Sequence, residues 1–106
     1  MEDIQIVVAD LLRRLPEIPG DAVLSQTFKK DDKMDVTLFS FAAGQELTEH
    51  TSPYRAILEV LKGEGSMTLG REFTEIKAGS WVYMPPELPH SLKTKTPLVM
   101  LLTLVK

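Results

Sequence analysis

The spacing of hydrophobic residues changes near Gly20. Before this residue, apolar side chains recur every three or four positions over residues 4–15, which is typical of a short amphipathic helix. Pro16 is expected to end this helix, and Pro19–Gly20 to form a turn. A strand over residues 4–8 is the alternative, because so short a run does not distinguish the two periodicities.

After Gly20 the pattern predicts strands only. Apolar runs are separated by glycine, by proline or by polar turns such as Lys29–Lys33, and Gly70–Arg71 suits a two-residue hairpin. The expected strands are Ala22–Lys30, Met34–Ala43, Leu47–Thr51, Tyr54–Lys62, Ser66–Leu69, Glu72–Lys77, Ser80–Met84, Leu88–Lys93 and Leu98–Val105. Many short strands at regular spacing are typical of an all-β barrel or sandwich.

The last predicted strand, Leu98–Val105, is apolar on both of its faces. A strand with one face in water should instead alternate apolar and polar residues. We therefore expect one face to line the barrel interior and the other to be covered by the N-terminal helix or by a second subunit.

Composition and charge narrow the class of protein. The 106 residues contain no linker or low-complexity segment, so we expect one domain, with the helix and turn over 1–19 and the barrel over 20–106. The absence of cysteine excludes disulfides and thiolate metal sites. The net charge of -3, without a basic cluster, argues against a nucleic-acid partner. The apolar run Ile6–Ala9 is too short for a signal peptide or a membrane span, so a cytoplasmic protein with no membrane partner is expected.

The only two histidines occupy similar places in two segments of the chain. The segment Gly44–Gly63 contains a glycine, His50, a proline and an apolar run. The segment Gly79–Thr94 contains a glycine, an apolar run, prolines and then His90. If both segments fold back onto one barrel, the two imidazoles should meet inside it.

The first of these segments resembles a signature motif of the cupin superfamily, Gly-x5-His-x-His-x3-4-Glu-x6-Gly. Gly44, His50 and Gly63 match the motif. Ser52 stands where the second histidine is expected, and Ala56 where the glutamate is expected. In this segment the chain therefore has the glycines of the motif but lacks two of the residues that bind a metal in the family.

The second segment resembles the partner motif, Gly-x5-Pro-x-Gly-x2-His-x3-Asn. Gly79, Pro85 and His90 match, whereas Glu87 replaces the second glycine and Thr94 the asparagine. The resemblance implies a double-stranded β-helix, a jelly-roll type of barrel. The run His-Thr-Ser-Pro-Tyr followed by Val-Leu-Lys-Gly-Glu is also similar to a group of small stand-alone cupins of undefined activity.

Strand alternation separates inward from outward residues in the strand Tyr54–Lys62. Ala56, Leu58 and Val60 should line the interior, and Arg55 and the residues of its parity should face outward. That outward set also contains Ile57, Glu59 and Leu61. Outward isoleucine and leucine indicate a covered sheet face, which the resemblance to cupins suggests is a homodimer contact, with Glu59 pairing to a cation across it.

The site itself is open to three interpretations. In the first, His50 and His90 are ordinary polar residues at the rim of the barrel. In the second, they hold a divalent transition metal, although firm sites have three or four protein ligands. The candidates for a further ligand would be Glu46, Glu49, Tyr54 and Glu87.

In the third interpretation, the two histidines mark a metal-free pocket for a small organic ligand. Ser52 shares the parity of His50, so the pocket mouth is expected to comprise His50, Ser52, Tyr54 and His90 over an apolar floor. We therefore expect a small-molecule-binding protein. A metal-dependent isomerase or dioxygenase and a non-catalytic accessory or sensory module are the alternatives, since one fold hosts many functions.

Overall fold

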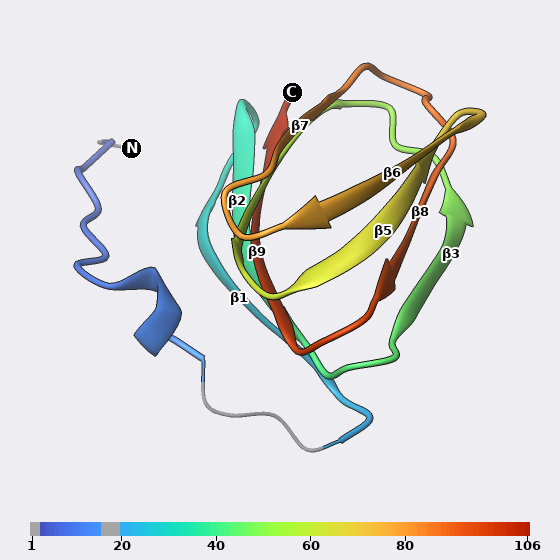
Figure 1. Ribbon diagram of the computed structural model, residues 1–106. Coiled ribbons are helices and arrows are strands. Elements are labelled where there is room, and N and C mark those ends of the chain that lie inside the picture. Colours follow the sequence, from blue (N-terminus) through green and yellow to red (C-terminus); the bar gives the residue numbers. More distant parts are fainter. Residues whose placement is uncertain (1–2, 16–19) are drawn as a thin grey trace.

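The computed structural model describes residues 3–15 and 20–106, and within them the chain forms nine β-strands and one short 3-10 turn, η1 (Figure 1). The elements are η1 (Leu11–Arg13), β1 (Val23–Lys30), β2 (Met34–Phe41), β3 (Glu46–His50), β4 (Arg55–Lys62), β5 (Glu64–Leu69), β6 (Glu72–Lys77), β7 (Trp81–Met84), β8 (His90–Thr94) and β9 (Leu98–Val105). Each predicted strand is present, with ends that match the prediction or differ from it by no more than two residues. For example, β8 begins at His90 rather than Leu88, because Pro89 has no N–H to donate to a ladder.

The strands of the described residues form two antiparallel sheets. One has five strands in the order β1-β2-β9-β4-β7, and the other has four in the order β3-β8-β5-β6. Strands far apart in the sequence therefore lie side by side, as where β9 separates β2 from β4. Figure 1 shows the two sheets curving around a shared interior. The predicted all-β jelly-roll barrel is confirmed.

The predicted N-terminal helix over residues 4–15 is wrong except for η1. Asp10 caps this single turn, because its carboxylate accepts the Leu12 N–H at 3.2 Å. Residues 3–9 form neither the helix nor the alternative strand. Their β-branched residues lower helix propensity, and so short a helix is marginal in water without a packed face. Pro16 and Pro19, the predicted helix stop and turn, lie outside the described residues.

The N-terminal segment instead runs beside β1, outside the barrel, and contacts that strand through a few side chains (Figure 1). The Asp3 carboxylate is 2.8 Å from the Lys29 ammonium. The guanidinium of Arg14 lies 5.6 Å from the centre of the Phe28 ring. No helix in the described part of the chain is long and apolar enough to cross a membrane.

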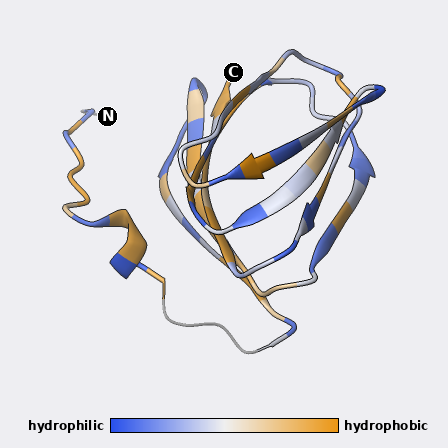
Figure 2. Ribbon diagram, in the orientation of Figure 1, coloured by the Kyte–Doolittle hydropathy of each residue, from blue (hydrophilic) through white to orange (hydrophobic). Residues whose placement is uncertain are grey.

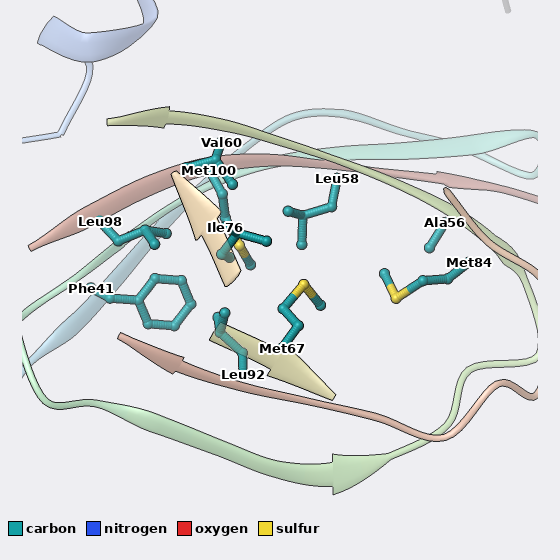
Figure 3. Close-up of a cluster of buried hydrophobic side chains, with 10 residues drawn as sticks. All are labelled: Phe41, Ala56, Leu58, Val60, Met67, Ile76, Met84, Leu92, Leu98 and Met100. Atoms are coloured by element: carbon teal, nitrogen blue, oxygen red, sulfur yellow. The ribbon is translucent and has the colours of Figure 1, made fainter. Parts of the chain in front are cut away.

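The hydrophobic core lies between the two sheets (Figure 3). The predicted alternation in β4 is confirmed, because Ala56, Leu58 and Val60 are buried while Arg55 is exposed. Figure 2 shows the hydrophobic residues that run along β9. The inner residues Leu98 and Met100 are buried. On its outer face, Val99, Leu101 and Thr103 are half-buried and Val105 is exposed, so the predicted cover over this second face is partial within this chain.

The end of the barrel remote from the histidines is closed by close backbone contacts. Gly63 has a φ of 86°, and a Cβ there would collide with the carbonyl of Pro97 and lie 2.9 Å from the Leu98 Cα. A Cβ at Gly65 would collide with the carbonyl of Lys93. Only glycine fits at these two positions.

Thr94 fastens the same end through its hydroxyl, which is almost fully buried. The hydroxyl donates to the Ala42 carbonyl at 2.7 Å and accepts the Gln45 N–H at 2.9 Å. These bonds connect β8 to the turn between β2 and β3. The residue at the motif's asparagine position therefore has a structural role.

Candidate functional site

The two histidines meet at the open end of the barrel, as the sequence predicted. His50 ends β3, His90 begins β8, and the two residues are paired across these neighbouring strands. Their ring centroids are 4.1 Å apart, with an interplanar angle of 59°. His50 is exposed and His90 is half-buried. The pair thus lies between solvent and the barrel interior.

Backbone carbonyls fix the tautomer of both rings. The Nδ1 of His50 is 2.9 Å from the Thr48 carbonyl oxygen, and the Nδ1 of His90 is 2.9 Å from that of Leu88. A carbonyl oxygen can only accept, so each Nδ1 must carry the hydrogen and donate it. In a neutral ring the Nε2 atom is then left as an acceptor. Each of the two neighbouring rings therefore offers one acceptor nitrogen.

A cavity of about 130 Å³ lies beside these rings, inside the barrel. Apart from the two imidazoles, its lining is apolar and comes from both sheets: Phe39, Leu47, Leu58, Met67, Met84, Leu92, Met100 and Leu102. Figure 3 shows Leu58 and Met67 pointing toward each other from opposite sides. The arrangement combines an apolar floor with two polar atoms, as is usual in small-ligand sites.

The three methionines of this lining, Met67, Met84 and Met100, were not singled out by sequence reasoning. Strand alternation could have placed them inside, because each shares the parity of apolar, buried or half-buried neighbours such as Leu69, Val82 and Leu98. Unbranched thioether side chains fill irregular space and adapt to an occupant. They make the floor of the cavity deformable.

Ser52 is not among the residues that line the cavity. The strand ends at His50, so the alternation that placed Ser52 beside it does not continue. The Ser52 hydroxyl accepts the Tyr54 N–H at 3.2 Å, and its carbonyl accepts the Glu87 N–H at 2.8 Å. Ser52 therefore joins the loop after β3 to the loop before β8.

Tyr54 lies apart from the cavity as well. It lines a separate surface hollow together with Pro53, Arg55, Pro86, Val105 and Lys106. The ammonium of Lys106 lies 5.6 Å from the centre of the Tyr54 ring. A role for Ser52 or Tyr54 in binding a ligand would require movement of these loops.

The carboxylates proposed as further metal ligands do not join the histidines. Among residues 3–15 and 20–106, no group of three or more histidine, aspartate or glutamate side chains could hold a metal ion. Glu46, Glu49 and Glu87 are all exposed. At the position of the motif's glutamate, Ala56 is buried in the core.

Glu87 has a backbone conformation that explains the glycine of the resembling motif. Its φ is 67°, in the left-handed region that glycine adopts without strain. This chain keeps the turn and accepts the strain of a side chain there. Its carboxylate is exposed and its N–H bonds to Ser52, so its observed role is to shape the loop beside His90.

The hairpin between β1 and β2 lies at the same end of the barrel. The Asp31 carboxylate accepts the backbone N–H groups of Lys33 and Met34, at 2.8 and 2.9 Å. These bonds, with the ammonium of Lys29 nearby, lower the pKa of Asp31 below its ordinary value. The charges of this hairpin are thus used to hold its own turn.

Comparison with known proteins gives the family. A model of the cupin domain matches residues 37–104, which is more than half of the chain and includes both histidines. The chain belongs to the cupin family. A conserved protein of unknown function from Streptococcus pyogenes, SPY1581, is 31% identical to this cupin; the alignment covers 100% of this chain and 90% of that one, with a TM-score of 0.85.

Other relatives share less with this cupin. Salicylate 1,2-dioxygenase from Pseudaminobacter salicylatoxidans is 17% identical, with a TM-score of 0.74, over 83% of this chain and 27% of the enzyme, so the likeness is one of fold. An uncharacterized protein of Methanocaldococcus jannaschii is 43% identical over 37 residues, which make up 35% of the cupin and 30% of that protein. The cupin thus spans under a third of the length of that relative.

Proposed function

We propose that this cupin binds a small organic molecule in the cavity between His50 and His90. The observation that carries the proposal is the pairing of two fixed Nε2 acceptors with an apolar cavity of about 130 Å³. Apolar protein cavities of roughly 150 Å³ hold a benzene molecule. The volume and the apolar lining of the cavity therefore favour a ligand whose apolar part is about the size of one six-membered ring.

The histidines define the other end of such a ligand. Acceptors left without donors in a partly buried site are unfavourable, so a matching ligand carries a hydroxyl or another hydrogen-bond donor. A phenol has both features, a ring for the floor and a hydroxyl for the imidazoles. Sites built to hydrogen-bond a hydroxyl strongly reject analogues that lack it.

The competing hollows on this chain support the proposal less well. One of them, of about 290 Å³, lies on the barrel surface and is lined mostly by charged or small residues, including Glu64, Glu75, Lys77 and Lys95. It has neither an apolar floor nor a histidine. The smaller cavity inside the barrel combines both features.

The test is a titration with phenol and with toluene, followed by NMR of the methionine methyl groups. We expect phenol to shift the methyl signals of Met67 and Met84, and to bind at least ~10-fold more tightly than toluene. The double change His50→Phe with His90→Phe removes both acceptors and should reduce phenol affinity to that of toluene, while Met34→Leu, a change outside the cavity lining, should leave it unchanged. Absence of methyl shifts at saturating phenol, or equal binding of the two probes, would show the proposal to be wrong.

A metal-dependent enzyme, an isomerase or a dioxygenase, is the second candidate. It is favoured by the Nδ1–H bonds to carbonyls, because metal-binding histidines usually donate their other ring N–H in this way. A divalent metal bound to the two Nε2 atoms would supply a Lewis acid. The residues fit poorly, since two protein ligands are fewer than firm sites use.

Metal content separates the two candidates. Protein purified without a histidine tag is analysed by elemental mass spectrometry, beside His50→Ala and His90→Ala. Stoichiometric metal in the native chain that is lost from both variants would favour the enzyme. Metal-free protein that binds phenol would favour the organic-ligand pocket.

We also propose that this binding unit is a homodimer, as the outer face of the larger sheet suggests.

A further inference from the structure

The outer face of the four-stranded sheet carries a trough that runs along β5. Figure 1 shows β5 between β6 and β8. Met67 of β5, Ile76 of β6 and Leu92 of β8 are buried in the core, so the residues that alternate with them face outward. On β5 these outward residues, Ser66 and Thr68, have short side chains. The strands β6 and β8, roughly 10 Å apart, carry mostly longer ones.

Directly paired residues of adjacent strands form rows across the trough. The outward rows, each given from β6 across β5 to β8, are Phe73–Thr68–Ser91 and Glu75–Ser66–Lys93, and Lys77 pairs with Glu64 in the row beyond them. From Glu64 to Thr68 the trough extends over four residue steps, which is roughly 13 Å. It is thus longer than one six-membered ring.

Two hollows occupy this trough. One, of about 290 Å³, lies at the Glu64 end, and the other, of about 270 Å³, reaches Phe73. Gly65, Glu75 and Lys95 line both hollows, so the two adjoin. Each exceeds the roughly 150 Å³ that holds a benzene molecule. Each half of the trough therefore has room for a six-membered ring.

Phe73 presents an exposed ring in the wall that β6 forms. Its side chain is 68% exposed, although apolar surface in contact with water is unfavourable. In the part of the chain that the structure describes, no other aromatic ring and no cation stacks on it. The face of an aromatic ring is negative and attracts C–H groups with partial positive charge. The ring is therefore available to stack on a ligand.

The hydroxyl groups on the outer face are free to bond to a ligand. Ser66, Thr68 and Ser91 make no side-chain hydrogen bond within residues 3–15 and 20–106. Glu75 adds acceptors on one wall and Lys93 adds donors on the other, and neither forms an ion pair among the described residues. A hydroxyl both donates and accepts, so a polyhydroxylated ligand matches these groups.

The charges around the trough balance. The carboxylates are those of Glu46, Glu64 and Glu75, and the ammonium groups are those of Lys77, Lys93 and Lys95. The charged groups of Lys95 and Glu64 lie 4.0 Å apart, so part of this charge is already neutralised. A site for a phosphate or a nucleotide would need an excess of positive charge. The trough therefore favours a neutral polar ligand.

We propose that this trough binds an extended neutral oligosaccharide of β-linked glucose-type rings, with one ring stacked on Phe73. The ring substituents of β-linked glucose are equatorial, so each face consists of C–H groups that suit an aromatic ring. The sugar hydroxyls at the edge of the ring then bond to the serine, threonine and charged groups of the trough. A β-1,4-linked chain is straight, as is a trough along one strand. The inference does not rest on the proposed phenol pocket, which lies on the inner side of this sheet.

Titration of the ¹⁵N-labelled native chain with cellotetraose, followed by ¹H–¹⁵N NMR, tests the proposal. We expect a dissociation constant of about 1 mM or lower, with the largest shifts at the amides of Ser66, Thr68 and Phe73. Maltotetraose, whose chain is curved, should bind at least ~10-fold more weakly. Phe73→Ala should weaken cellotetraose binding by ~10-fold or more, whereas Phe73→Tyr keeps the ring and should stay within ~3-fold of the native value. Trp81→Ala, which removes a ring that is 62% exposed on the other sheet, is the matched control without effect.

Ser66→Leu fills the floor of the trough and should abolish binding, which gives a second variant in case Phe73→Ala fails to fold. Absence of amide shifts at ~10 mM cellotetraose, shifts outside the trough, or unchanged binding by Phe73→Ala would each overturn the proposal. Binding of AMP in place of cellotetraose would assign the trough to phosphate-bearing ligands and overturn it as well. Phenol binding by the Phe73→Ala protein is measured separately and should be native. The trough and the phenol pocket can therefore fail independently of each other.

Discussion

The two ends of this cupin barrel are built differently. At the closed end, Gly63 and Gly65 leave no space for even a methyl group, and the Thr94 hydroxyl bonds two backbone groups. At the open end, two imidazoles border an apolar cavity, and the backbone at Glu87 is strained. The closed end is determined by backbone fit and the open end by side-chain chemistry. The close backbone contacts thus lie at the end of the barrel away from the cavity beside the histidines.

The largest effect is expected from a methyl group at the closed end. Gly63→Ala should lower the free energy of unfolding by roughly 3 kcal/mol or more, since it combines a backbone collision with a positive φ. Gly20→Ala is the control, because a Cβ there meets nothing within 4 Å. Urea denaturation measures both variants. A Gly63→Ala protein as stable as the control would show that this end is not tightly packed.

The next effect concerns the buried hydroxyl of Thr94. Thr94→Val keeps the shape of the side chain and removes both hydrogen bonds, which leaves the Ala42 carbonyl without that donor. We expect a loss of about 2 kcal/mol in the free energy of unfolding. Thr74→Val, whose hydroxyl makes only a bond of 3.5 Å, should change stability much less. Equal effects of the two substitutions would contradict a fastening role for Thr94.

The open end should respond in the opposite direction. Glu87→Gly relieves the left-handed strain and should stabilise the protein by about 0.5–1 kcal/mol in thermal or urea unfolding. Glu87→Ala keeps the strain and is the matched control. If the Glu87→Gly protein is no more stable to unfolding than the Glu87→Ala protein, the backbone at Glu87 is not strained.

Much of the fold could be predicted from the sequence. Period-two alternation and the punctuation by glycine and proline placed each strand to within one or two residues, because both signals are local. The prediction of an N-terminal helix was wrong. It used the spacing of apolar residues alone and did not include the lower helix propensity of β-branched residues or the need of a short helix for a packed face. In the structure, that segment is held by Lys29 and Phe28, contacts that no local pattern reveals.

The site was predicted less completely than the fold. The matching positions of His50 and His90 in two related segments predicted their meeting. Ser52 does not line the cavity, because alternation was extended beyond the end of the strand. The role of Thr94 depends on partners about fifty residues away, at Ala42 and Gln45, and such bonds follow only from the tertiary structure.

The proposed ligand pocket depends most on which nitrogen of each imidazole carries the hydrogen. Two-bond ¹H–¹⁵N correlation NMR assigns the tautomer of neutral histidine rings directly. At a pH where both rings are neutral, we predict hydrogen on Nδ1 in His50 and His90, with Nε2 free to accept from a ligand. Hydrogen on Nε2 in both rings would contradict the carbonyl bonds and remove the basis of the proposed pocket.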